Sequence, residues 1–187
     1  MPRKALPPPL VIKMDEIVQR LIINAGDPVE FAKEIRSKPY KSGPLTVYHL
    51  TPSRNLDSIK RVGLKAGLPP ISEAFEGLPT IGVLFFSESL RSIGAYKHEL
   101  WRNRTHNLDE IIPRYWSLIE VNLPEGVFLL KDPFTEMLTR SWITIFDVAP
   151  AYLKVLGHYD FLTIREPSMI LGDPPPGFQG QDAEMFD

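Results

Sequence analysis

The residues best suited to chemistry in this sequence are a histidine and a threonine at the exit of one short apolar stretch. Residues 45–51 predict a short buried strand that delivers His49 and Thr51 to its end. A capped turn and a short helix that closes at Gly63 are expected to follow. An imidazole at this position can donate a hydrogen bond to a ligand hydroxyl, and Thr51 can supply another. A structural histidine satisfied by the backbone is an equally good interpretation of the position alone.

The other histidines are weaker candidates for catalysis or metal binding. His98 and His106 fall around a predicted helix and its exit, and their spacing matches no strong metal pattern. The stretch from Lys97 to Leu100 lacks the second helical histidine of a zinc motif, so we expect no metal. His158, near the last predicted strand, is interpreted as a polar surface residue. Glycine-rich phosphate loops and the Gly-x-Ser-x-Gly elbow of serine hydrolases are both absent from the sequence.

The composition narrows the class of protein. The 187 residues are 43% hydrophobic and 24% charged, which predicts one globular domain with a real core. A formal net charge of -2 gives no electrostatic reason to expect a nucleic-acid binder. The absence of cysteine excludes disulfides, thiolate metal sites and cysteine nucleophiles. No apolar run approaches the roughly 18 residues of a membrane span, and no secretory signal is evident, so we expect a cytoplasmic monomer without membrane contact.

The two ends of the chain predict elaborations of a main domain rather than sites. Residues 1–11 are expected to form a flexible proline-rich arm. Residues 12–40 predict helices packed on the domain, because apolar side chains recur on a helical stripe. The second of these helices has Asp27 as its N-cap and Pro28 at its first helical position. Residues 172–187 are expected to be a disordered tail.

Residues 41–171 form the predicted main domain. Residues 38–44 are expected to be a loop, and the glycine- and proline-containing residues 64–81 a longer one. A helix is expected after Ser87 or Ser89, either of which can cap it. Further strands are predicted at residues 82–87, 115–123, 127–130, 142–146 and 159–164. Because strands outnumber helices without strict alternation, the sequence favours an α+β fold over a doubly wound sheet.

Two stretches of this domain, taken in order, resemble the ADP-ribosyltransferase superfamily. Residues 47–51 and 55–64 are similar to the strand, histidine and "Asn-Leu-x-Ser-Ile … Gly-Leu" pattern that opens many bacterial and phage members. Residues 82–87, with the later Ala95 and Tyr96, resemble the "Gly-Ile-Tyr-Phe … Ser-x-x-Tyr" block of poly(ADP-ribose)-polymerase-like domains. The resemblance therefore covers the stretch that carries the candidate histidine.

A third stretch, residues 142–153, looks like the late strand and turn that normally carry the catalytic glutamate of this family. Ser141 and Trp142 stand where that glutamate would start the strand. The nearest carboxylate is Glu136, five residues upstream, with Asp132 behind it. Three arrangements stay open: Glu136 reaches in from a loop, the target supplies the base, or the domain binds NAD⁺ without turning it over.

The resemblance implies a split β-sheet that holds NAD⁺, as a substrate, in a cleft. It assigns His49 to the adenosine ribose, backbone groups of Leu50 to the nicotinamide amide, and Tyr96 to stacking on the nicotinamide ring. An aromatic face suits a cationic heterocycle of this kind. The implied NAD⁺-binding set is Tyr48, His49, Leu50, Thr51, Asn55, Phe86, Ser87 and Tyr96. The implied catalytic set is Glu136, His49 and Tyr96.

The function implied by this resemblance is mono-ADP-ribosyl transfer from NAD⁺ to a macromolecular target, either protein or nucleic acid. One alternative is a catalytically inactive binding or inhibitory module that keeps the fold, and another is an NAD⁺ glycohydrolase toxin. The RNA 2′-phosphotransferases share the fold but need an arginine–histidine pair, and here Tyr48 precedes the histidine. The absence of a glutamate at position 141 also argues against the synthesis of long polymers.

Overall fold

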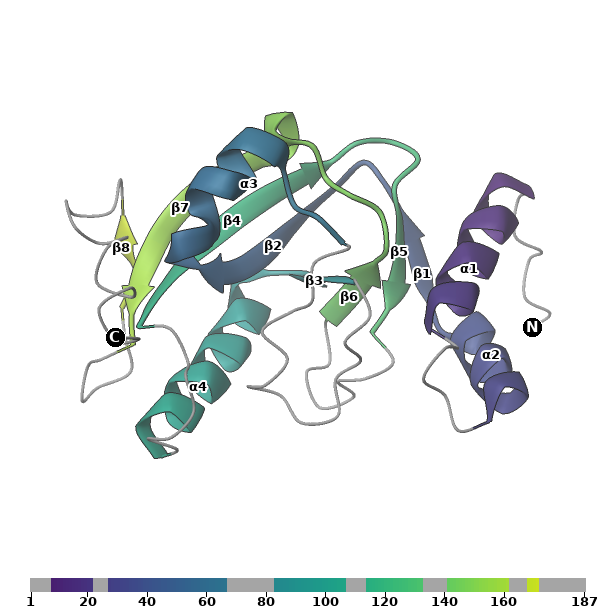
Figure 1. Cartoon of the computed structure of the whole chain (residues 1–187), viewed down its shortest axis with the longest axis horizontal. Coiled ribbons are helices and arrows are strands. Elements are labelled where there is room, and N and C mark those ends of the chain that lie inside the picture. The colour runs from purple at the N-terminus through teal and green to yellow at the C-terminus, as the bar shows by residue number, and fades with distance from the viewer. Residues whose placement is uncertain are drawn as a thin grey trace.

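The computed structural model describes residues 8–21, 27–66, 83–106, 114–132, 141–161 and 168–171. The described strands form one eight-stranded sheet in the order β1-β5-β6-β3-β2-β4-β7-β8, and every pairing is antiparallel. In sheet order the strands are β1 (Tyr40–Ser42), β5 (Phe128–Lys131), β6 (Ser141–Thr144), β3 (Leu84–Ser87), β2 (Leu45–Pro52), β4 (Tyr115–Leu123), β7 (Leu153–Asp160) and β8 (Ile170–Leu171). The predicted α+β class is confirmed (Figure 1).

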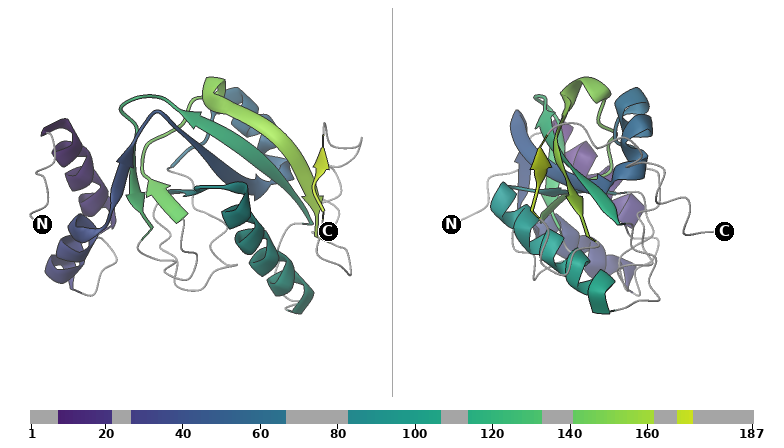
Figure 2. Two further views of the ribbon diagram at one scale, coloured as in Figure 1. Left: turned by 180° about the vertical axis from the view of Figure 1, so that it is seen from behind. Right: turned by 90° about the vertical axis from the view of Figure 1, so that its left-hand side faces the viewer.

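Helices cover both faces of this sheet. The helices are α1 (Pro8–Leu21), α2 (Pro28–Ser37), α3 (Leu56–Val62) and α4 (Leu90–His106), and short 3-10 turns lie at Ser53–Asn55 and Pro150–Tyr152. One face, which we call the α4 side, is covered by α4 over β2 and β4 and by α1 and α2 over β5 and β6. The opposite face, the α3 side, is covered by α3. Figures 1 and 2 show α3 and α4 on opposite sides of β2 and β4.

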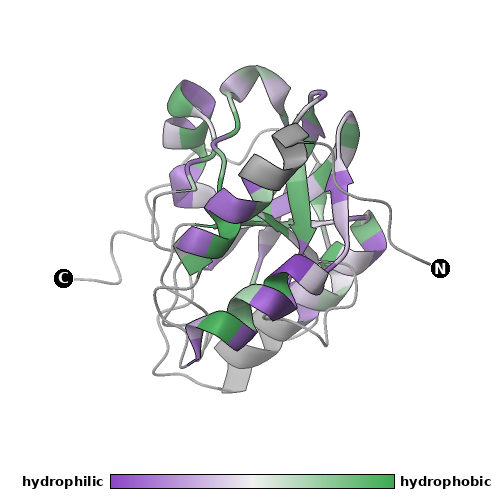
Figure 3. Cartoon of the chain, turned by 90° about the vertical axis from the view of Figure 1, so that its right-hand side faces the viewer, coloured by the Kyte–Doolittle hydropathy of each residue, from purple (hydrophilic) through white to green (hydrophobic). Residues whose placement is uncertain are grey.

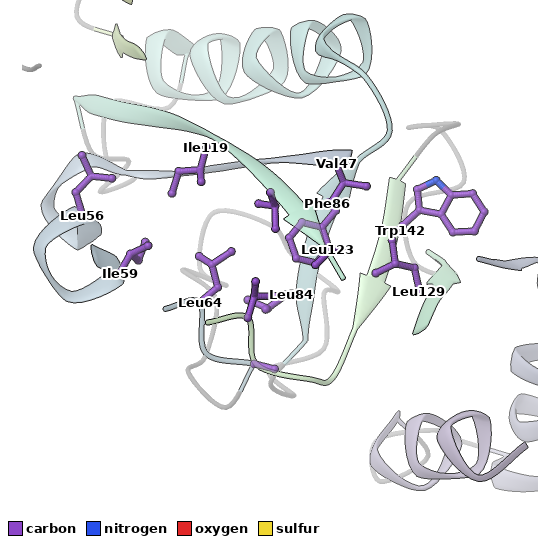
Figure 4. Close-up of a cluster of buried hydrophobic side chains, with 13 residues drawn as sticks. Val47, Leu56, Ile59, Leu64, Leu84, Phe86, Ile119, Leu123, Leu129 and Trp142 are labelled. Carbon is purple, nitrogen blue, oxygen red and sulfur yellow. The ribbon is translucent and has the colours of Figure 1, made fainter. Parts of the chain in front are cut away.

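The largest apolar core lies on the α3 side. Leu56 and Ile59 of α3 point toward strand residues that include Val47, Phe86 and Ile119 (Figure 4). These residues alternate along their strands with residues that face the α4 side, as the two-residue period of a strand requires. Both faces of β2 are therefore part of the core, and its neighbours fix its orientation.

The helix ends follow the predicted capping chemistry. The Asp27 carboxylate accepts hydrogen bonds from the amides of Val29 and Glu30 at 3.0 and 3.1 Å, with Pro28 at the first helical position. Helix α3 ends at Gly63, whose φ of 80° favours glycine. A Cβ atom at Gly63 would stand 2.0 Å from the Val148 carbonyl oxygen, so the position excludes any larger residue. These predicted caps are confirmed.

The N-terminal segment differs in part from the prediction. Helix α1 already begins at Pro8, so residues 8–11 are helical and do not belong to an extended arm. Prolines are tolerated in a first turn because its backbone N–H groups have no intrahelical acceptor. The predicted apolar stripe of this helix is buried against the sheet; its members are Met14, Ile17, Val18 and Leu21. The hydropathy colouring in Figure 3 shows apolar and polar residues on different faces of the described helices.

Two strand predictions also need correction. The predicted loop at residues 38–44 contains the edge strand β1, whose residues pair with Phe128–Leu130 of β5. The last long strand, predicted at residues 159–164, is β7 and runs from Leu153 to Asp160. Its backbone is held by β4, so a lysine and a glycine inside it do not end the strand. None of the helices in the described residues is long and apolar enough to cross a membrane.

Candidate functional site

The two edges of β2 are paired very differently. Toward β4, every residue of Leu45–Pro52 has a register partner. Toward β3, the two strands share a single pair, Tyr48 with Ser87. A continued antiparallel ladder would cover the β2 edge at residues 49–51, but these two described strands form no such pair. The sheet therefore divides beside His49, at the residues that the sequence predicts to contact a ligand.

His49 spans this division with its side chain. Its Nδ1 lies 2.9 Å from the carbonyl oxygen of Phe85 on β3, and the ring meets Phe86 edge-on at 5.8 Å between centroids. Because a carbonyl oxygen only accepts, Nδ1 carries the hydrogen. Burial lowers the pKa of His49, outweighing the hydrogen bond to Phe85, which raises it. The neutral ring therefore keeps Nε2 as an acceptor, so it would accept a hydrogen bond from a ligand hydroxyl where the sequence interpretation had it donate one.

The predicted residues after His49 form the wall behind it. The Leu50 side chain is buried toward α4, so its backbone is the part that lies along the divided edge. The Thr51 hydroxyl is also buried and accepts a hydrogen bond from the Asn55 side-chain amide at 3.3 Å. Phe86 is 1% exposed and belongs to the core on the α3 side. Thr51 and Phe86 therefore support the histidine and its turn from inside the protein.

A row of polar residues crosses four strands on the α4 side, beginning at the one pair that joins β2 to β3. Tyr48 pairs with Ser87, and Ser87 pairs with Ser141 at the start of β6. The Asp132 amide donates to the Ser141 carbonyl at 3.2 Å, which continues the β5–β6 register by one residue. Residues paired directly in antiparallel strands point to the same face. We call Asp132, Ser141, Ser87 and Tyr48 the polar row.

Tyr96 brings α4 to this row. Tyr96 and Tyr48 pack against the same apolar cluster under α4, which includes Leu50 and Ile93. Burial, and after it the negative charge of Asp132, raise the pKa of the Tyr96 phenol. Tyr96 is therefore a neutral phenol at physiological pH. Because the charge of Asp132 contributes to this raised pKa, the Tyr96 side chain on α4 lies near the β5 end of the polar row.

The structure places the predicted ligand-binding residues on both sides of the divided sheet. His49 and Thr51 belong to the α3 side, whereas Tyr48, Ser87 and Tyr96 belong to the α4 side. The predicted residues therefore face opposite sides of the sheet and meet only along the interrupted ladder between β2 and β3. The predicted acid Glu136 lies outside the described residues, as do residues 67–81 of the predicted long loop.

Two carboxylates beside this region were missed or passed over in the sequence interpretation. Asp132 is 3% exposed and ends β5 at the polar row. Glu88 follows β3 on the α3 side, where it accepts a hydrogen bond from the Trp142 indole at 3.1 Å and pairs with Lys41 at 3.1 Å. A carboxylate directly after a predicted strand was a usable signal for both, because strand ends are common places for ligand contacts.

A buried polar chain lies under the other edge of β2. The Ser117 hydroxyl lies 2.8 Å from Nδ1 of His158 and 2.7 Å from the Ser53 hydroxyl. All three side chains are fully buried. The prediction of His158 as a surface residue is therefore wrong, because its ring is buried and a serine on the neighbouring strand bonds its Nδ1. This chain anchors the turn after β2 and has no access to a substrate.

The candidate site thus offers a neutral imidazole acceptor, two phenols, two serine hydroxyls and a buried carboxylate, along the interrupted ladder and the polar row. Such a set can hold hydroxyl-rich ligands and stabilise a developing positive charge. No group of three or more histidine, cysteine, aspartate or glutamate side chains suited to a metal ion occurs among the described residues.

A scan against models of protein families finds no match. A search of curated proteins for similar sequences finds none either.

Proposed function

We propose that this chain is an NAD⁺-dependent mono-ADP-ribosyltransferase that acts on a macromolecular target in the cytoplasm. The observation that carries the proposal is the single pair between β2 and β3, with His49 at the point of division. An interrupted ladder leaves strand edge available to an amide group of a ligand, as edge strands generally do. The nicotinamide amide is such a group, and the Leu50 backbone lies along this edge.

The chemistry of the side chains agrees with this assignment. Nε2 of the neutral His49 ring can accept a hydrogen bond from a ribose hydroxyl. The Tyr96 ring offers an aromatic face to the cationic nicotinamide, an attraction that disappears when nicotinamide leaves as a neutral molecule. The reaction also needs a carboxylate near the sugar carbon, where positive charge develops.

A binding assay with two substitutions of His49 separates a ligand contact from a structural role. His49→Asn keeps an N–H donor near the position of Nδ1, and so preserves the hydrogen bond to Phe85, but lacks Nε2. His49→Ala lacks both. We expect both variants to weaken NAD⁺ binding by about 10-fold, the worth of one good hydrogen bond, in isothermal titration calorimetry. Both should also lose transfer of labelled ADP-ribose to proteins or nucleic acids of a cell extract.

Thr46→Ala is the matched control, because Thr46 is an exposed residue of the same strand that bonds Asn122 away from the division. It should bind NAD⁺ like the wild type. Wild-type affinity in His49→Asn would show that the imidazole only joins the strands. A wild-type protein that neither binds NAD⁺ nor releases nicotinamide contradicts the proposal itself.

The same assay tests the two alternatives. Binding of NAD⁺ without nicotinamide release would leave a non-catalytic binding or inhibitory module. Nicotinamide release without label transfer would indicate an NAD⁺ glycohydrolase. In both outcomes NAD⁺ remains the ligand, but the protein does not transfer ADP-ribose to a target.

A further inference from the structure

We propose that Asp132 supplies the carboxylate that faces the reacting sugar carbon, in place of a glutamate at position 141. This inference rests on the proposed function, because it names the acid of the same reaction. It starts from the pairing of β5 with β6. The amide of Asp132 donates to the carbonyl of Ser141, so the two residues stand directly opposite each other.

The pairing of Asp132 with Ser141 places the Asp132 carboxylate close to the position at which the family resemblance expects a glutamate. Side chains directly opposite on antiparallel strands stand about 5 Å apart and point to the same face. A carboxylate at Asp132 therefore approaches the volume above Ser141 from the neighbouring strand. The polar row then continues through Ser87 to Tyr48, where the ladder between β2 and β3 is interrupted.

Other described carboxylates near the division are less well placed. Glu88 lies on the α3 side and is held by the Trp142 indole and the Lys41 ammonium group. Glu120 shares the α4 side with Tyr48, its partner across the β2–β4 ladder, but it lies on the fully paired edge of β2, where its carboxylate accepts a hydrogen bond from the Asn122 side chain at 3.4 Å. Asp132 is 3% exposed, which strengthens the field of its charge, because water screens a buried group poorly.

Tyr96 lies on the same side of the sheet as the polar row, against the apolar cluster under α4. Burial raises the pKa of its phenol most, and the charge of Asp132 raises it further, so the carboxylate lies near the side chain assigned to the nicotinamide ring.

The proposed reaction takes place at C1′ of the ribose and needs only NAD⁺, the Asp132 carboxylate and the acceptor group of the target. The bond between C1′ of the ribose and N1 of nicotinamide breaks, its electron pair stays on nitrogen, and nicotinamide leaves neutral. The positive charge that remains on the ribose ring is stabilised by the Asp132 carboxylate. A hydroxyl, carboxyl or amine of the target then forms a bond with C1′. The proton it carries passes to the carboxylate and on to solvent.

The test compares the two candidate acids under conditions in which NAD⁺ binding is measured separately. Asp132→Asn is isosteric and removes the charge. We expect it to lower the rate of nicotinamide release by about 10²–10⁴-fold, while the dissociation constant for NAD⁺ changes less than 5-fold. Glu136→Gln should keep most of the wild-type rate. Asp160→Asn, a control carboxylate paired with Arg114 away from the row, should keep the rate as well.

Ser141→Lys keeps the proposal testable if Asp132→Asn does not fold. It leaves Asp132 in place but sets an ammonium group opposite it, and should lower the rate at unchanged thermal stability. If Asp132→Asn folds, its combination with Ser141→Glu should recover part of the rate, because it returns a carboxylate to the row.

A folded Asp132→Asn protein with the wild-type rate overturns the inference, as does a large loss confined to Glu136→Gln. In both cases the wild-type protein still binds and turns over NAD⁺, so the proposed function survives. If the wild-type protein does not bind NAD⁺, the proposed function fails first, and the assignment of Asp132 fails with it.

Discussion

Strand β2 is fixed along the whole of one edge and at a single point of the other. Its ladder with β4 has no gap, and Leu118 lies opposite Leu50 in the core under α4. Its backbone pairing with β3 in the described residues is limited to Tyr48 with Ser87, and His49 adds a hydrogen bond to Phe85 and a ring contact with Phe86. The same eight residues therefore have a complete ladder on one edge and a single backbone pair on the other.

The contrast explains how a site can form in the middle of a sheet. In a central strand the backbone N–H and C=O groups normally bond to both neighbouring strands, so only its side chains can contact a ligand. Here the ladder with β4 keeps the strand in place without help from β3. The edge toward β3 carries a single pair, and the polar row starts at that pair.

The largest effect is expected from the fully paired edge. Leu118 is 0% exposed and fills the core between β4 and α4. Leu118→Ala should lower the free energy of unfolding by about 2–5 kcal/mol, because it removes a buried side chain and leaves a cavity. Urea denaturation followed by circular dichroism measures this. Leu90→Ala, at a half-exposed position on α4, should stay within about 0.5 kcal/mol of the wild type.

A smaller loss is expected from the buried chain below the same edge. Ser117→Ala removes the hydroxyl that joins His158 to Ser53, so the His158 Nδ1 and the Ser53 hydroxyl each lose a buried hydrogen bond. The free energy of unfolding should fall by about 1–3 kcal/mol, with NAD⁺ affinity unchanged in the folded protein. Ser58→Ala, an exposed helical position, controls for the loss of a hydroxyl. A change in affinity at full stability would place this chain in the site after all.

The strands that flank the division were predictable because their patterns are local. Residues 45–52 and 115–123 contain apolar runs of strand length, and the caps at Asp27 and Gly63 follow from single residues. β7 was misplaced because Lys154, Gly157 and His158 interrupt its apolar pattern. Pairing with β4 overrides that weak propensity, and pairing is not visible in a local window.

The division of the sheet and the polar row could not be predicted for a related reason. Both depend on the register between strands: Tyr48 pairs with Ser87, which is distant in sequence, and Asp132 pairs with Ser141, which begins the next strand along the chain. The sequence interpretation searched for an acid by closeness along the chain to Ser141 and so chose Glu136. Distance along the sequence does not measure distance across a ladder, where the paired residue is the true neighbour.

The smallest effect on the free energy of unfolding is expected at His49, whose imidazole contacts β3 beside the weakly paired edge of β2. His49→Ala should lower the free energy of unfolding by about 0.5–1.5 kcal/mol at pH 8, through the lost hydrogen bond to Phe85. The pH dependence is the sharper measurement. Burial lowers the pKa of His49 in the folded protein below its ordinary value of 6.5. Below pH 6.5 the unfolded chain therefore binds a proton that the folded protein resists, and stability falls as the pH falls toward the folded pKa.

His49→Asn isolates this contribution, because it keeps a donor for Phe85 and cannot titrate. Urea denaturation of both proteins between pH 8 and pH 5 should show the wild type losing more stability than His49→Asn. Every other titrating group is common to the two proteins, so the difference between the curves belongs to position 49. Parallel curves would mean that the pKa of His49 is the same in the folded protein and in the unfolded chain. The net effect of burial on the imidazole would then be absent, and the assignment of a neutral ring with Nε2 as an acceptor at pH 6 would be wrong.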